Sequence, residues 1–259
     1  MRHFRTFLLL ALVAASGAAL AAGPAAKASA PAAKSGNAVI LDAIHKLAPK
    51  ADVQQVKPAP LTGFHSAVVG GTVVYVRDDG KYLIHGQIFD LSQPQVTDIS
   101  ETVMDGMRQK ALAKLPASER IRFAPKDPKY HITAFVDVEC PFCRQFHAKI
   151  DKYMSEGIAV DYLLFPLQGI HPQADRKAQA VWCAADRTAA YSAAMAGSDP
   201  GDATCENPLD KLKSLGQRLG VTGTPTIVAD DGSIISPRIA QSPKQLAAVL
   251  KAHKDAAGG

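Results

Sequence analysis

Two cysteines separated by two residues are the part of this chain whose types and spacing most directly suggest chemistry. They are Cys140 and Cys143, within the segment FVDVECPFCRQF at residues 135–146. Two thiols at this spacing can bind a metal, form a small structural bridge or exchange electrons with another protein. The elements around them have to distinguish these three roles.

The dithiol lies where an expected strand passes into an expected helix. The segment HITAFVDV is typical of a buried strand, and a helix is expected from Cys140 to about Ser155. Pro141 suits the first helical position, because its missing N–H would be unpaired there anyway. Thiolates at the positive end of a helix dipole can have pKa values of about 3.5–7.5. We therefore expect Cys140 to be the nucleophile and the more buried Cys143 to be the resolving thiol.

The other two roles fit the sequence less well. A closed zinc site needs four ligands, and one C-x-x-C supplies two of them. The remaining cysteines, Cys183 and Cys205, are 22 positions apart and form no second pair of this kind. A purely structural bridge between Cys140 and Cys143 would close a tiny loop and constrain almost nothing. We therefore expect redox chemistry, with no metal site and no cofactor.

Cys183 and Cys205 are better explained as a structural disulfide. A bridge between them would span an inserted helical region whose segment AMAGSDPGDATCENP is rich in glycine, proline and aspartate. Closing a loop of this length contributes on the order of 3 kcal/mol in the chain-entropy model. Four cysteines allow three pairings, and this one leaves Cys140 and Cys143 free to exchange.

The N-terminal segment has the organisation of a cleaved secretory signal peptide. Residues 1–22 have a basic start, an apolar middle and small residues at the end. The apolar part is shorter than the about 20 residues of a spanning helix, so we expect no membrane insertion. Residues 23–36 lack large apolar side chains and are expected to be a disordered leader. The mature chain is thus expected to be exported to a compartment where disulfides persist.

The charge balance argues against two classes of partner. The chain has 29 basic and 24 acidic residues, and removal of Arg2 and Arg5 with the signal peptide lowers the net charge from +5 to about +3. Proteins that bind nucleic acid or anionic membranes through charge carry larger basic surpluses. We therefore expect neither partner.

The segment before the dithiol domain divides into a small sheet and a helix. Residues 37–97 contain one short helix and three β-rich runs separated by Gly-Gly and Asp-Asp-Gly turns, which predicts a small antiparallel sheet. A domain of about 60 residues is marginal alone, so it either pairs with a second copy through an edge strand or packs against its own chain. Residues 98–117 are expected to form a linker helix, with Asp98 and Glu101 at capping-box spacing.

The rest of the chain, residues 118–259, has the element order of a thioredoxin domain. Once a helical stretch at residues 174–196 is set aside as an insertion, the order is β-α-β-α-β-β-α. The expected fold class is therefore α+β: a small N-terminal α+β domain, a linker helix, and a thioredoxin-like α/β domain with a helical insertion.

Several longer motifs give the chain a family resemblance over about residues 37–251. They are YVRDDGKYLIHGQIFDL, FVDVECPFCRQFH, YLLFPLQGI, AVWCAADR and LGVTGTPTIV. Together they resemble the DsbC family of periplasmic thiol:disulfide interchange proteins, with the related DsbG proteins as the second choice. The C-x-x-C alone is a weak signal, whereas its combination with FPLQG, WCA and GTPT is a strong one.

The resemblance implies roles for individual residues. It makes Cys140 the attacking thiol and Cys143 the resolving thiol, and it places the Thr224-Pro225 loop beside them, with Pro225 in the cis form, to bind the backbone of the substrate. Cys183 and Cys205 match a second, structural disulfide of DsbC-like proteins that DsbG-like proteins generally lack. The dipeptide Pro141-Phe142 departs from the Gly-Tyr usual in DsbC and is nearer the Pro-Tyr of DsbG.

The function implied by this resemblance is that of a homodimeric periplasmic disulfide isomerase or reductase. Misfolded disulfide-containing proteins would bind an uncharged cleft around Phe142 and the Pro225 loop, and a DsbD-type membrane reductase would supply electrons. One alternative is a DsbG-like chaperone or reductase of oxidised cysteines. A DsbA-like thiol oxidase is less favoured, because the extra domain at residues 37–97 argues against a monomeric oxidase.

A comparison with thioredoxin raises the question of which group accepts a proton from the buried thiol. Thioredoxin has a buried aspartate six residues before its first active-site cysteine, and this chain has Ala134 there. Asp137 and Glu139 are nearer the dithiol, but their place at a strand end predicts solvated side chains. His147, one turn beyond Cys143, is expected on the helix surface.

Overall fold

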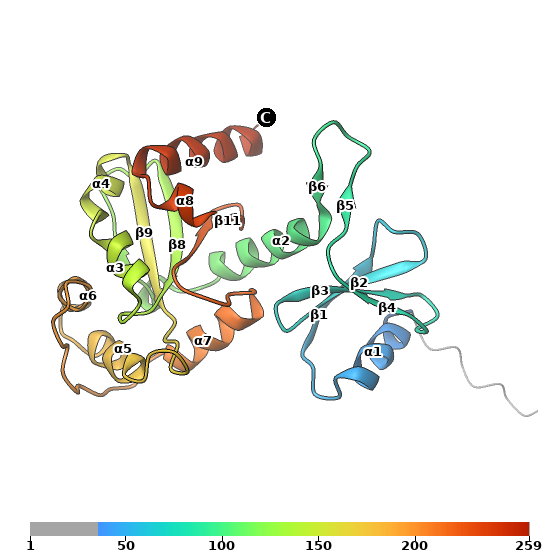
Figure 1. Ribbon diagram of the computed structural model, residues 1–259, viewed down its shortest axis with the longest axis horizontal. Helices are drawn as coiled ribbons and strands as arrows, with labels where there is room; N and C mark the ends of the chain where they lie inside the picture. Colours follow the sequence, from blue (N-terminus) through green and yellow to red (C-terminus); the bar gives the residue numbers. More distant parts are fainter. Residues whose placement is uncertain (1–35, 259) are drawn as a thin grey trace, which may run out of the picture. The chain divides into compact units, whose positions relative to one another are not determined.

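The structure is a computed structural model that describes residues 36–258 (Figure 1). The expected signal peptide at residues 1–22 and all but the last residue of the expected leader lie outside the described part. Gly36, assigned above to the leader, instead begins the first helix. No helix within residues 36–258 is both long enough and apolar enough to cross a membrane.

A four-stranded antiparallel sheet with one helix forms the first part of the described chain. Its strands follow in the order β1-β2-β3-β4, and the elements are α1 (Gly36–Leu47), β1 (Val53–Pro58), β2 (Phe64–Val69), β3 (Thr72–Arg77) and β4 (Leu83–His85). Helix α1 packs on the sheet through a cluster that includes Ile40, Ile44 and Val76. Strand β1 was not expected from the sequence, because the run VQQVKP has few apolar side chains to mark it.

A short ribbon and a long helix follow the sheet. The ribbon pairs β5 (Phe89–Asp90) with β6 (Thr97–Asp98), and α2 extends over Ile99–Ala113. The helix begins where the capping residues predict, because the Asp98 carboxylate accepts the Glu101 N–H at 3.0 Å.

The second sheet has the strand order and directions of a thioredoxin fold. Its order is β11-β10-β8-β9-β7, with β8 and β9 parallel and the other pairs antiparallel. The strands are β7 (Ile121–Phe123), β8 (Tyr130–Val136), β9 (Ile158–Leu164), β10 (Thr226–Ala229) and β11 (Ile234–Ile235). Strand β7 was not expected, and the run SIISP forms a shorter strand than predicted because helix α8 begins at its proline.

Helices cover both faces of this sheet (Figure 1). They are α3 (Pro141–His147), α4 (Ile150–Ser155), α5 (Ala174–Trp182), α6 (Arg187–Met195), α7 (Leu209–Arg218), α8 (Pro237–Ala240) and α9 (Pro243–Gly258). Alternate residues of β8 point to opposite faces, so that Ala134 and Val136 share a core with α3, α4, α6 and α9, whereas Phe135 packs with α2 and α7. The single helix expected from Cys140 to Ser155 is interrupted at residues 148–149.

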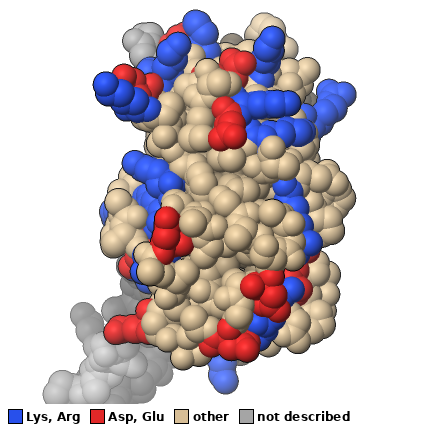
Figure 2. All heavy atoms as spheres, turned by 90° about the vertical axis from the view of Figure 1, so that its left-hand side faces the viewer, with Lys and Arg blue, Asp and Glu red and all other residues tan. Residues whose placement is uncertain are grey.

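Charged residues of both signs are distributed over the face drawn in Figure 2. Blue side chains are most frequent in the upper part of this view and red ones in the lower part, with a largely uncharged area between them, so neither sign covers the whole face. This distribution agrees with the small net charge of the sequence.

A buried ionic cluster joins three strands at the edge of the second sheet. The Asp161 carboxylate on β9 is fully buried and accepts from Arg120 at 2.8 Å, Arg122 at 2.6 Å and His131 at 2.8 Å. Burial alone would raise the pKa of Asp161, but these hydrogen bonds hold it well below the usual range of a carboxyl. Burial also opposes the charge of His131, yet its bonds to Asp161 and Asp230 raise its pKa to about 9.

We expect Asp161→Asn to lower the free energy of unfolding by about 3–5 kcal/mol, because an amide leaves the buried Arg120 and the partly buried His131 without their counter-charge. Urea unfolding at pH 7 measures the change. The matched control is Asp230→Asn, which changes the exposed partner of the same His131 and should cost less than about 1 kcal/mol. Equal losses in the two variants would contradict the role of the buried carboxylate.

Candidate active site

Cys140 lies at the junction between β8 and α3, where its thiol is held against a neighbouring loop. It is the N-cap residue of α3, with φ −69° and ψ 120°, and Pro141 occupies the first turn. Its Sγ atom donates to the Thr224 carbonyl at 3.1 Å. Both thiols are free, and Cys143 is fully buried whereas Cys140 keeps 4% of its surface exposed. The structure thus places Cys140 nearer to solvent than Cys143.

The surroundings shift the pKa values of the two thiols in opposite directions. Several hydrogen bonds together lower the pKa of Cys140 to about 5 against the opposing effect of burial, and the bond from the Cys143 thiol is the largest of them. The Thr224 side chain and the N–H groups of Cys143 and Phe142 make smaller contributions to this lowering. For Cys143, burial raises the pKa far above that of an ordinary thiol, and its bond to Cys140 adds to the increase. At neutral pH, the arrangement therefore favours a thiolate at Cys140 and a thiol at Cys143.

The Thr224-Pro225 loop faces the dithiol because β10 pairs with β8. Thr226, the first residue of β10, is the register partner of Phe135 near the end of β8. The Thr224–Pro225 peptide bond is cis. Among the described residues, the buried Thr224 hydroxyl has no hydrogen-bond partner while the Cys140 sulfur is a thiol bonded to the Thr224 carbonyl. It can therefore donate to a sulfur that becomes negatively charged.

A groove of about 470 Å³ opens beside the dithiol. Its wall is formed by α3, the Pro225 loop and α8, with Phe142, Gln145, Thr224, Pro225, Ile227, Ile235, Pro237, Arg238, Ala240 and Gln241 as lining residues. The Phe142 side chain is 62% exposed and offers a contact for an apolar segment. The cleft was expected to be uncharged, but Arg238 contributes one positive charge to its wall.

Asp137 and Glu139, which precede the dithiol in the chain, are held in a hydrogen-bond network, so the expectation of solvated carboxylates is wrong. Asp137 is 1% exposed, and its carboxylate accepts from Glu139 N–H, Leu167 N–H and His171 Nδ1, each at 2.8 Å. Glu139 pairs with Lys177 at 2.8 Å. These bonds fasten the end of β8 to the loop that follows β9.

Comparison with known proteins agrees with this geometry. A family model described as the disulfide bond isomerase protein N-terminal domain matches residues 21–101, and a thioredoxin-like domain model matches residues 117–254. The thiol:disulfide interchange protein DsbC of Dickeya dadantii is 34% identical over 84% of this chain and 88% of its own length. The Escherichia coli K12 protein of the same name is 31% identical over 86% of this chain and 91% of its own.

The chain belongs to the DsbC family. Among solved structures, the disulfide interchange protein of Neisseria gonorrhoeae is 34% identical and covers 47% of this chain and 87% of its own, with a TM-score of 0.44. Membership makes the chain a thiol:disulfide interchange protein with a DsbC-type N-terminal domain and a thioredoxin-like domain.

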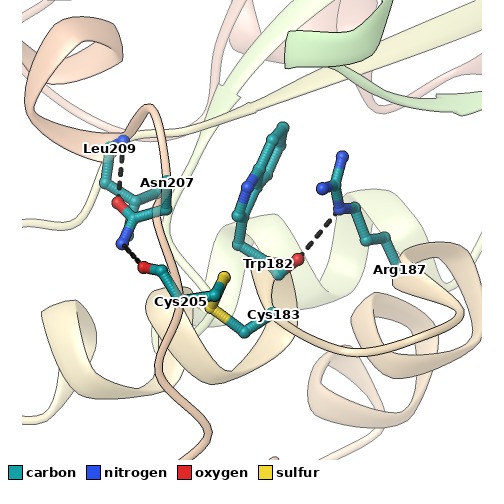
Figure 3. The surroundings of a disulfide bond; sticks show 6 residues. All are labelled: Trp182, Cys183, Arg187, Cys205, Asn207 and Leu209. Carbon is teal, nitrogen blue, oxygen red and sulfur yellow. Dashed lines mark hydrogen bonds between the residues drawn. A yellow bond between two sulfur atoms is a disulfide. The ribbon is translucent and has the colours of Figure 1, made fainter.

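The second pair of cysteines in this DsbC-family chain is joined by a disulfide (Figure 3). Cys183 ends α5, and Cys205 lies in the irregular segment before α7. Next to the bridge, the Arg187 guanidinium lies 3.9 Å from the centre of the Trp182 ring and donates to the Trp182 carbonyl. The bridge thereby ties the long connection of the helical insertion back to a helix that packs in the core.

We expect a chain with Cys183→Ala and Cys205→Ala to lose roughly 3 kcal/mol of unfolding free energy, because the loop between these residues is no longer closed. Thermal unfolding of the oxidised and variant proteins measures the difference. The rate of the first step of thiol exchange at Cys140 should stay within about twofold, since neither cysteine of the bridge is among the groups that set the pKa of Cys140. An equal stability of the two proteins would contradict the role of a staple.

His147 is the functional candidate whose environment the sequence analysis misjudged. It was expected on the helix surface, but it is 6% exposed and packs in the same core as the dithiol. The signal that could have revealed this is the spacing of Cys143 and His147, which places them on one face of a helix.

Ala134 is fully buried, so no carboxylate occupies the thioredoxin position. Within residues 36–258, no group of three or more His, Cys, Asp or Glu side chains is arranged to hold a metal ion.

Proposed function

We propose that this DsbC-family protein is a homodimeric periplasmic disulfide isomerase that acts on misfolded secreted proteins. The observation that carries the proposal is the pair of free thiols whose pKa values are shifted apart, beside an open groove. A low pKa gives Cys140 the negative charge needed to attack a disulfide, while Cys143 stays protonated until it is needed.

The reaction cycle follows from these states. The Cys140 thiolate attacks one sulfur of a wrong substrate disulfide, forms a mixed disulfide and releases the other substrate sulfur as a thiolate. A second substrate thiolate then attacks the mixed disulfide, so the substrate is rearranged and Cys140 is regenerated. When no such thiolate arrives, Cys143 attacks Cys140, and the substrate leaves reduced while the pair becomes a disulfide.

The cycle has to start from the dithiol, so an electron donor is part of the proposal. A membrane reductase of the DsbD type would reduce the Cys140–Cys143 disulfide through its own thiols. Residues 1–22 would direct the export of the chain to the periplasm, where its dithiol could meet such a donor. Cys183 and Cys205 would remain oxidised throughout.

Dimerisation is proposed for the N-terminal domain, residues 37–97, with α2 as the linker to the catalytic domain. Strand β4 is an edge of its sheet, and an unpaired edge can add a strand from a second copy. Large apolar side chains are exposed in the same region, at Tyr82, Ile84, Phe89, Leu91 and Val96. Sedimentation of residues 23–259 tests this part of the proposal, and a monomer at micromolar concentration would overturn it.

The test of the function is the reactivation of a protein whose disulfides have been scrambled. Catalytic amounts of the reduced protein should restore native pairing, and the Cys140→Ala variant should not. The isomerase proposal would be overturned if the wild type failed to reactivate the scrambled protein but readily reduced its disulfides.

A DsbG-like role, in which the protein holds clients or reduces single oxidised cysteines, is the second candidate. The observation that favours it is the dipeptide Pro141-Phe142, because the residues between the thiols help to set the redox properties of the pair. If Cys140→Ala prevented client aggregation as well as the wild type, and the wild type failed to reactivate scrambled proteins, this candidate would replace the first.

A further inference from the structure

Arg238 places a positive charge in the wall of the groove beside the dithiol. It is the second residue of α8, it is exposed, and its guanidinium makes no hydrogen bond or ion pair with another residue of the range 36–258. A guanidinium presents its N–H donors in a planar fork that matches the geometry of a carboxylate. The charge of Arg238 is therefore available to a molecule that enters the groove.

The second sheet brings this wall of the groove to the attacking thiol. Strands β10 and β11 pair antiparallel, so the Pro225 loop before β10 lies beside the start of α8, which follows β11. Both segments line the groove. Thr224 of the same loop also holds the attacking thiol, because its carbonyl accepts from Cys140 at 3.1 Å. A polypeptide whose cysteine is bonded to Cys140 can therefore lie along the wall that carries Arg238.

The other polar side chains of the groove add donors and no negative charge. The Lys149 ammonium donates to the Gln241 side-chain oxygen at 2.9 Å and to its backbone carbonyl at 2.8 Å. Within the described part of the chain, the amide N–H groups of Gln241 and the side chain of Gln145 make no hydrogen bond. None of the residues that line the groove, all of them described, is an aspartate or a glutamate. The groove thus combines an apolar surface with donors and a positive charge.

The carboxylates that precede the dithiol in the chain are already engaged. Glu139 pairs with Lys177 at 2.8 Å, and the buried Asp137 accepts three hydrogen bonds. The negative charge that acts on a substrate at this site is that of the Cys140 thiolate, which repels an acidic molecule. Arg238 carries the charge that offsets this repulsion along the groove wall.

We propose that Arg238 selects disulfide-bonded polypeptides that carry an aspartate or glutamate close to the attacked cysteine. The apolar wall around Phe142 contacts the uncharged part of such a segment, and the carboxylate pairs with the guanidinium. The inference deepens the proposed function, because it names the substrate class of the same groove, and it rests on attack by Cys140. Arg238 is a specificity-determining residue and takes no part in the exchange of bonds.

The test uses short peptides that each contain one cysteine in a disulfide with thionitrobenzoate. Glutamate or glutamine stands on both sides of the cysteine, and the other residues are the same neutral ones in both peptides. The Cys140 thiolate forms a bond to the peptide sulfur, and the bond between that sulfur and thionitrobenzoate breaks. Thionitrobenzoate leaves with the electron pair as a yellow thiolate, so its absorbance gives the second-order rate constant for each peptide.

We expect the wild type to attack the glutamate peptide about fivefold faster than the glutamine peptide, in the range of one exposed ion pair. Arg238→Gln should lower this ratio to about one or below, because the thiolate is then the charge that remains, and Arg238→Lys should keep most of it. The rate with the glutamine peptide should stay within about twofold in both variants, since Arg238 is not among the groups that set the pKa of Cys140.

Arg218→Gln is the matched control. It removes the same charge from the chain at the end of α7, outside the residues that line the groove, and should leave the ratio unchanged. Salt at about 0.5 M should bring the wild-type ratio toward one, because mobile ions screen exposed charges. A loss of preference in Arg218→Gln would show that the net charge of the protein, and not the groove, selects the peptide.

An equal ratio in the wild type and Arg238→Gln would overturn the proposal, as would a wild type that attacks both peptides at the same rate. Loss of reaction with both peptides in Arg238→Gln would indicate damage to the site, and Arg238→Glu, in which the ratio should fall below one, then decides. Failure of the proposed function has a different signature, because a protein that cannot reactivate scrambled substrates can still prefer the glutamate peptide.

Discussion

Replacing Cys140 by alanine should abolish disulfide exchange, with a loss of about 1000-fold or more in the rate of attack on a disulfide. Cys143 cannot take over this role, since it is fully buried and burial raises its pKa. A buried thiol has almost no thiolate at neutral pH and no contact with a protein substrate. Reduction of a chromogenic disulfide and reactivation of a scrambled protein both measure the loss.

Cys143→Ala should behave differently from Cys140→Ala. The variant keeps the attacking thiol and loses the internal route of escape, so mixed disulfides with substrates should accumulate. Non-reducing electrophoresis followed by mass analysis detects them. The two roles would be reversed if Cys140→Ala attacked disulfides at a rate near that of the wild type. They would also be reversed if the wild type formed its mixed disulfides through Cys143.

Cys140 should titrate with a midpoint near pH 5, far below an ordinary thiol. A thiol is ionised at pH values above its pKa, so at pH 7 almost all of Cys140 should be thiolate. A thiol with a pKa of about 8.5 would be about 3% ionised at the same pH. The absorbance of the thiolate at 240 nm, measured on the reduced protein from pH 3 to 9 with the oxidised protein as reference, gives the midpoint.

Two variants separate the causes of this low pKa. The hydrogen bond from Cys143 is the largest contribution, so Cys143→Ala should raise the midpoint more than Thr224→Val, which removes the second side-chain donor. Ser192→Ala, a change away from Cys140, serves as the control and should leave the midpoint unchanged. A midpoint near 8.5 in the wild type would contradict the account of Cys140 as a stabilised thiolate.

The order of the main elements and the dithiol could be predicted from local patterns in the sequence. The strand before Cys140 is rich in β-branched and aromatic residues, and Pro141 marks the start of the helix. Asp98 marks the start of α2 in the same way, because capping depends on residues close together in the chain. Strands β1 and β7 were missed since short or polar edge strands carry little hydrophobic periodicity.

The surroundings of the dithiol could not be read from the same patterns. Asp137 ends a strand and resembles a solvated residue, but its partners come from a loop about 30 positions later. His147 belongs to a helix of seven residues, which is too short for its apolar face to be recognised, and its neighbours come from β9 and α6. Whether a side chain is buried by distant segments depends on tertiary packing, which cannot be predicted from the local pattern of one sequence.

The most direct test of the central claim is the redox state of Cys140 and Cys143 in the living periplasm. Acid quenching, alkylation of free thiols and mass analysis of the peptides report both cysteine pairs in one sample. The account predicts a mostly reduced Cys140/Cys143 pair beside an oxidised Cys183/Cys205 pair, because a donor keeps the active site ready to attack disulfides. A mostly oxidised Cys140/Cys143 pair would contradict the isomerase proposal and indicate a protein that delivers disulfides to its substrates.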